Sequence, residues 1–171
     1  MPCWAGLGVG TTKLNMSTRS VTTVRSKWAR EEDYKTHARI YRHHDGYPDG
    51  HGKWLYRWLD GMVIVNGLTG KEPPKHANGP GRLAAQMTAA LLAEEHEPDL
   101  LNHDGDSGQE YEYRISVEFG EQGGTMAIEV FDGPICEDAD LLFQGTVEEF
   151  GAWIEQPKAV MQPGRGRNIE A

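Results

Sequence analysis

The most regular pattern in the chain is an alternation of apolar and polar residues between positions 109 and 120. Apolar side chains occupy every second position: Tyr111, Tyr113, Ile115, Val117 and Phe119. Polar side chains fill the positions between them: Glu112, Arg114, Ser116 and Glu118. A period of two predicts a strand of an antiparallel sheet, with its apolar face on the core and its polar face in solvent.

Further strand signals lie on both sides of this segment. Downstream, the turn sequence EQGG leads into the apolar stretch 126–131, and another strand is expected over residues 140–145. Upstream, the β-branched stretch 20–25 and the alternation over residues 37–42 indicate two more strands. Together these signals predict a sheet of about five strands.

Three segments carry helical patterns instead. From Lys53 to Gly67, apolar side chains recur at helical spacing: Trp54, Leu55, Trp58, Leu59, Met62 and Val63. A second helix is expected to begin at Pro80, with this buried stripe: Leu83, Ala84, Met87, Ala90 and Leu91. A short helix follows Thr146, which can form a capping box with Glu149.

We expect the first two helices to form an antiparallel hairpin on one face of the sheet. The element order is then β-β-α-α-β-β-β-α, which places the fold in the α+β class. One domain is expected over residues 16–155. The terminal stretches 1–15 and 156–171 lack apolar periodicity, and we expect both to be disordered. The sequence leaves open whether translation starts at Met1 or at Met16.

Charge and composition narrow the function classes. The formal net charge is −9, which argues against nonspecific binding to nucleic acid because that needs a basic surface. No apolar run approaches the roughly 20 residues that span a bilayer. The two cysteines, Cys3 and Cys136, come without a secretory signal, so we expect reduced thiols and a cytoplasmic protein, in the host cell if a phage encodes it. The oligomeric state stays open.

The segment IYRHHDGYPDGHG, residues 40–52, carries a resemblance together with the start MSTRS and the strand GQEYEY. This combination resembles a family of small, uncharacterised phage and prophage proteins that share a Y-x-H-x-D-G-Y-P motif. The matching residues are Tyr41, His43, Asp45, Gly46, Tyr47 and Pro48; His44 stands where members commonly carry tryptophan. The resemblance implies a phage-type accessory protein, with counter-defence as one role, and assigns no catalytic residue.

Two polar, glycine-rich loops are the candidate functional surface. A helical hairpin would bring loop 103–110 back to loop 43–52, at the end of the sheet where the first helix begins. Free backbone N–H groups at that helix start suit an anion. We therefore expect a noncatalytic site for a small, nucleotide-like anion, lined by these residues: Arg42, His43, Asp45, Tyr47, Lys53, Asp106 and Gln109. Turn formation alone is the competing interpretation of the first loop.

Two other functions stay open on the same sequence. Histidine and aspartate are ligands for divalent metals, so the loops would also suit a metal-dependent hydrolase, with candidate ligands His43, His44, Asp45, His51, Asp104 and Asp106. No catalytic residue and no required cofactor is assigned. The acidic charge would alternatively suit an inhibitor that occupies a host protein.

Overall fold

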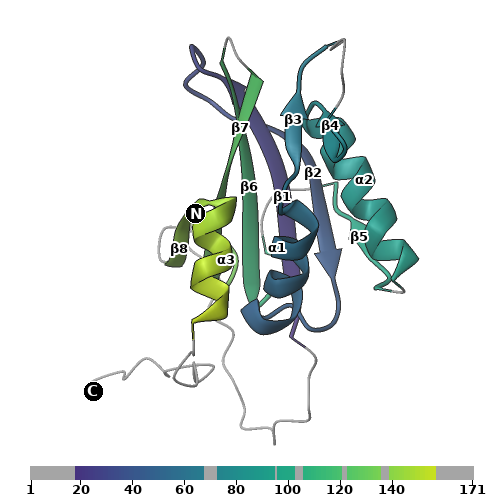
Figure 1. Ribbon diagram of the computed structural model, residues 1–171. Coiled ribbons are helices and arrows are strands. Elements are labelled where there is room, and N and C mark those ends of the chain that lie inside the picture. The colour runs from purple at the N-terminus through teal and green to yellow at the C-terminus, as the bar shows by residue number, and fades with distance from the viewer. Residues whose placement is uncertain are drawn as a thin grey trace, which may run out of the picture.

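The computed structural model describes residues 18–67, 73–94, 96–102, 106–120, 123–135 and 139–156. In this part of the chain, eight strands form one curled sheet and three short helices lie against it (Figure 1). No helix of the described segments is long and apolar enough to cross a membrane.

The sheet is built around four long central strands. The bounds of the strands are β1 Ser20–Trp28, β2 Lys35–Arg42, β3 Val63–Val65, β4 His76–Asn78, β5 Asp99–Leu100, β6 Tyr111–Gly120, β7 Gly123–Asp132 and β8 Asp140–Thr146. The hydrogen-bonded order is β4-β3-β7-β6-β1-β2-β5, and β8 also pairs with β7. Two antiparallel units, β1–β2 and β6–β7–β8, are joined in the middle by the parallel pair of β1 and β6.

The helices cover the inner face of this sheet. Their bounds are α1 Lys53–Leu59, α2 Pro80–Ala93 and α3 Val147–Glu155, and a π-helical turn, Pro48–Gly52, runs directly into α1. Helix α1 packs against α3, while α2 lies across β1 and β2. Leu55 and Leu59 of α1 are fully buried, together with Ile115 and Ile128 of the sheet. Burial of this continuous apolar layer is the main stabilising contribution to the fold.

Several local predictions are confirmed. Thr146 accepts a hydrogen bond from the Glu149 backbone N–H, and the Glu149 carboxylate accepts one from the Thr146 backbone N–H, so the capping box is present. Helix α2 starts at Pro80, with Gly79 as its N-cap. The apolar positions of β6 point inward: Tyr113, Ile115 and Val117 are fully buried.

The predicted architecture of about five strands and a helical hairpin is wrong. Helix α1 ends at Leu59, because Gly61 adopts a φ of +70° that a right-handed helix does not accommodate. The chain then leaves as strand β3, and two strands separate α1 from α2. The partner of α1 is α3, so the described chain is mostly sheet, with three separate short helices.

The strands β3, β4 and β5 are only two or three residues long. Each pairs with a distant or parallel neighbour, such as β5 with the end of β2. No period can be read from so few residues, which explains why the sequence pattern did not predict them. The predicted terminal stretch 1–15 and nearly all of 156–171 lie outside the described residues.

Candidate functional site

Loop 43–52 and the described part of the second predicted loop, residues 106–110, lie at one end of the sheet, although no helical hairpin brings them there. The Gly46 backbone N–H donates to the Thr18 carbonyl at 2.8 Å, and the Glu110 N–H donates to the Arg19 carbonyl at 3.0 Å. The loops therefore flank the start of β1 on its two sides. Parallel pairing of β1 with β6 places the start of β6 beside it, and the antiparallel β2 ends there too.

Arg42 is buried in the core at this end rather than exposed to a ligand. Its Nη1 donates to Nδ1 of His51 and its Nη2 donates to Nδ1 of His96, both at 3.1 Å. Since an arginine only donates, His51 Nδ1 is an acceptor, and its Nε2 carries the hydrogen that it donates to Thr22 Oγ1 at 2.7 Å. The loop histidine is therefore held by an internal chain of hydrogen bonds.

Burial keeps the hydrogen-bonded chain of Arg42, His51 and Thr22 in one charge state. Burial of the His51 ring, reinforced by the positive charge of Arg42, lowers its pKa from 6.5 to about 3. His51 is therefore neutral at ordinary pH. The ring stacks on Trp54 and meets Tyr113 edge-on, and the Tyr113 hydroxyl donates to the Gly46 carbonyl at 2.9 Å. The motif of the first loop thus makes contacts that hold the fold together.

The remaining predicted site residues are distributed over separate contacts. His43 pairs with Asp99 at 2.9 Å on the surface, and Lys53 pairs with Asp49 at 3.2 Å. The side chain of Asp106 accepts a hydrogen bond from the Gly108 N–H, which is a local turn contact. In the described residues, no hydrogen bond or ion pair joins His43, Asp45 or Tyr47 to Asp106 or Gln109.

The metal interpretation has no ligand set in the described segments. No three histidine, cysteine, aspartate or glutamate side chains converge there. His43 and His44 have ring centroids 6.2 Å apart, and His51 is committed to Thr22 and Arg42. The predicted ligand Asp104 lies outside the described residues.

A different polar site lies on the outer face of the sheet, opposite the helices. We expected the polar face of β6 to be solvated, but Glu112 and Ser116 are each only 5% exposed. Thr23 and Arg39, from β1 and β2, are just as buried. A cavity of about 220 Å³ opens on this face, lined by Thr23, Arg25, Tyr34, Thr36, Arg39, Glu112, Arg114 and Ile135.

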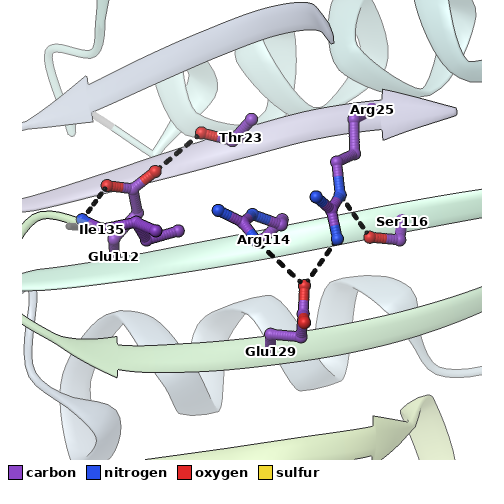
Figure 2. A network of polar contacts seen from close by, with 7 residues as sticks. All are labelled: Thr23, Arg25, Glu112, Arg114, Ser116, Glu129 and Ile135. Carbon is purple, nitrogen blue, oxygen red and sulfur yellow. Dashed lines mark hydrogen bonds and ion pairs between the residues drawn. The ribbon is translucent and has the colours of Figure 1, made fainter. Parts of the chain in front are cut away.

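Two arginines in this cavity share one carboxylate oxygen (Figure 2). Arg25 Nη2 lies 2.8 Å from Oε2 of Glu129, and Arg114 Nη1 lies 3.5 Å from the same oxygen. The Arg25 Nε also donates to Ser116 Oγ at 2.7 Å. All three charged side chains are between 16% and 20% exposed, so solvent screens them only partly.

Glu112 forms the second, better satisfied half of the network. Its Oε1 accepts a hydrogen bond from Thr23, and its Oε2 accepts hydrogen bonds from Gln109 and from the backbone N–H of Ile135, at 3.1 to 3.2 Å. Arg39 Nη2 lies 3.7 Å from the same Oε2. The predicted site residue Gln109 therefore belongs to this outer-face network.

The cations of the outer face are held close together against electrostatic repulsion. Burial lowers the pKa of Arg25, and the neighbouring positive charge of Arg114 lowers it further, while Glu129 acts in the opposite direction. Tyr34 adds a favourable contact, because its ring centroid lies 4.1 Å from the Arg25 guanidinium carbon. The ring is also 4.9 Å from Lys27 Nζ.

A second hollow, of about 690 Å³, lies beside the β1–β2 hairpin on the inner side. Its lining includes three consecutive acidic residues, Glu31, Glu32 and Asp33, and the half-exposed Trp28. Their negative charge makes this hollow unfavourable for an anion. The arginine-lined cavity is therefore the better candidate site for the expected ligand class.

Sequence reasoning missed the arginine site because its members come from strands far apart in the chain. Arg25 and Arg114 each occupy a polar position directly after a fully buried apolar residue of the strand, Val24 and Tyr113. The recurrence of arginine at a polar position in both strands was the signal that the sequence offered. The parallel register of β1 on β6 is needed to bring the two arginines together. Comparison with protein-family models, with curated proteins and with solved structures gave no significant match.

Proposed function

We propose that the protein binds a small anionic molecule, without turning it over, in the arginine cavity on the outer face of the sheet. The observation that carries this proposal is the sharing of one Glu129 oxygen by Arg25 and Arg114. Two partly buried guanidinium groups face one carboxylate, so among the described residues one positive charge is left without an equal partner. A bound anion would supply that partner.

The hydrogen-bonding capacity of the cavity supports the same function. Arg114 makes one long hydrogen bond, of 3.5 Å to Glu129, and its guanidinium carries five N–H donors. It packs over the ring of Phe131 at 5.1 Å, which fixes the position of the planar group. Such an arrangement offers preorganised donors to an oxyanion while leaving the fold itself stabilised by other contacts.

The proposed ligand is still the small anion expected from the sequence, but the proposed site is the arginine cavity and not the two loops. Arg42, which we expected to contact the ligand, donates to two histidines instead. The nucleotide-like character of the ligand, the phage-type role in counter-defence and the cytoplasmic location stay predictions. The same holds for the two alternatives, a metal-dependent hydrolase and an inhibitor of a host protein.

The test uses inorganic phosphate as the probe, titrated into the full chain and followed by NMR chemical shifts at constant ionic strength. Arg114→Gln removes the charge while keeping a side chain of similar shape, and we expect the dissociation constant to rise at least about tenfold, as for loss of a charged hydrogen bond. The matched control is Arg82→Gln, because Arg82 is exposed on α2, against the other face of the sheet.

Two results would overturn the proposal. One is equal phosphate affinity in the wild type, Arg114→Gln and Arg82→Gln. The other is conversion of a bound ligand: small molecules copurified from cells should be recovered chemically unchanged after the protein is denatured.

A further inference from the structure

Building on the proposed anion site, we infer that the cavity selects a singly charged oxyanion of the phosphodiester class over a doubly charged phosphate monoester. Among the described residues, the charges of the lining side chains and of Glu129, which contacts both lining arginines, lead to this selectivity. Arg25 and Arg114 contribute two positive charges and Glu129 one negative charge, whereas Arg39 and Glu112 form an oppositely charged pair of their own. A single negative charge on the ligand therefore balances the cavity.

A second negative charge would meet repulsion from carboxylates that the fold holds in place. Glu112 cannot easily move away, because it accepts hydrogen bonds from Thr23, Gln109 and the Ile135 backbone. Glu129 is held by Arg25 at 2.8 Å. Because Glu129 and the two arginines beside it are only 16% to 20% exposed, repulsion between like charges is weakened by solvent less than on an open surface.

The remaining lining groups favour a phosphodiester over a carboxylate among singly charged ligands. Thr36 and Tyr34 line the cavity and carry hydroxyl groups, which add neutral hydrogen-bond donors to those of the arginines. A phosphodiester presents its two charged oxygens from a tetrahedral centre and adds two weakly accepting ester oxygens, so it can meet donors from more directions than a planar carboxylate.

The size of the cavity sets how much of the ligand enters. Its volume of about 220 Å³ is below the roughly 300 Å³ at which sites for whole drug-sized molecules begin. The charged group with its nearest atoms fills this space, and the rest of the ligand lies outside. Model compounds that carry only the charged group are therefore suitable probes.

The experiment compares dimethyl phosphate, methyl phosphate and acetate at pH 8 and constant ionic strength, by NMR titration of the full chain. At this pH methyl phosphate is doubly charged, because its second pKa is about 6. We expect dimethyl phosphate to bind at least about fivefold more tightly than methyl phosphate, which corresponds to about 1 kcal/mol. We also expect it to bind more tightly than acetate.

A charge-changing variant sharpens the test. Glu129→Gln leaves the cavity with two uncompensated positive charges, so we expect the preference to change in favour of methyl phosphate. The matched control is Glu118→Gln, since Glu118 pairs with Lys27 on the same face, whereas Glu129 contacts both arginines of the cavity. This control should keep the preference of the wild type.

The possible failures are distinguishable. If the wild type prefers methyl phosphate or acetate, or if Glu129→Gln leaves the preference unchanged, the selectivity is overturned while anion binding stands. If none of the three probes binds to the wild type, the proposed function fails together with the selectivity. The wild-type comparison alone decides the question should Glu129→Gln fail to fold.

Discussion

Arg25 on the outer face, which is partly buried, and Arg42 in the core, which is buried, are two arginines with opposite surroundings. Burial lowers the pKa of both guanidinium groups. For Arg25 the next influence is the positive charge of Arg114, which lowers the pKa further. For Arg42 the next influence is the negative charge of Asp45, which raises it. One arginine is crowded by a like charge, and the other is compensated from within the fold.

The difference separates a binding group from a structural group. Both Nη atoms of Arg42 have acceptors within the fold, the buried His51 and the partly buried His96. The cations of the outer face line an open cavity and share an acceptor. A site for an outside ligand is therefore expected where the protein leaves its own charges incompletely balanced.

The largest effect that can test this comparison is a pH dependence of stability caused by His51. The pKa of His51 is about 3 in the folded protein and 6.5 as a free side chain, so between these values only the unfolded chain binds the proton. The free energy of unfolding should therefore fall by about 1.4 kcal/mol for each pH unit as the pH drops from about 6.5 toward 3.

Urea denaturation across this pH range measures the effect, and His51→Gln supplies the comparison. The variant lacks the titrating ring, so its stability should vary less steeply with pH than that of the wild type. His43→Gln is the matched control, because His43 is 49% exposed and lies outside the buried hydrogen bonds of His51. Parallel slopes for the wild type and His51→Gln would show that His51 is not held neutral by the core.

The next largest effect is the contrast between Arg42→Ala and Arg114→Gln. Arg42→Ala leaves the buried Nδ1 of His51 without its donor and removes packed atoms, so we expect a loss of about 3 kcal/mol. Arg114→Gln removes one long ion pair at a partly exposed position, and we expect a loss below about 1 kcal/mol. Denaturation midpoints compare the two directly.

Binding measurements should give the reverse order. Arg114→Gln should weaken phosphate binding, and Arg42→Ala should leave it unchanged at temperatures where the variant is folded. If the Arg42→Ala protein is stably folded but no longer binds phosphate, the anion site lies at the loop end and not in the arginine cavity.

The last of the expected effects concerns Gly46 in the first loop. A Cβ atom at Gly46 would lie 2.6 Å from the backbone carbon of Arg19 and 2.7 Å from the Ser20 nitrogen, so the loop and β1 would have to separate. We expect Gly46→Ala to destabilise the protein by about 2 kcal/mol. Gly81→Ala is the matched control, because nothing lies within 4 Å of its Cβ position in α2, and it should be neutral or stabilising. Equal thermal stability of the two variants would contradict the structural role of the loop.

Much of the local structure of the fold was predictable from the sequence, because long elements carry their own period. Strand β6 and helix α3 were read from alternation and from the Thr146–Glu149 capping box. The predicted first helix was longer than the observed α1, because Met62 and Val63 continue the helical spacing of apolar residues past Gly61. Short strands such as β3 form only because their neighbours are already in place.

The candidate site was less predictable than the fold. Alternation correctly placed Arg114 on the polar face of β6, but Glu112 and Ser116 on this face are buried rather than solvated. The position of Arg25 beside Ser116 follows from a parallel register between strands that lie about ninety residues apart, and no local pattern specifies that register. The histidine-rich loop was predicted as the site because its polar residues are adjacent in sequence. In the structure, His51 of this loop instead accepts a hydrogen bond from Arg42 in the core.

The parallel pair of β1 and β6 also has a consequence for the order of folding. Each of the two antiparallel units can form through short loops, but joining them requires closure of the long intervening chain, which is entropically unfavourable and slow. We expect the two hairpin units to form early and their union to limit the folding rate. Because Arg25 and Arg114 come from different units, the arginine cavity comes into existence only at that last step, and a bound anion should slow unfolding while leaving the early steps of folding unchanged.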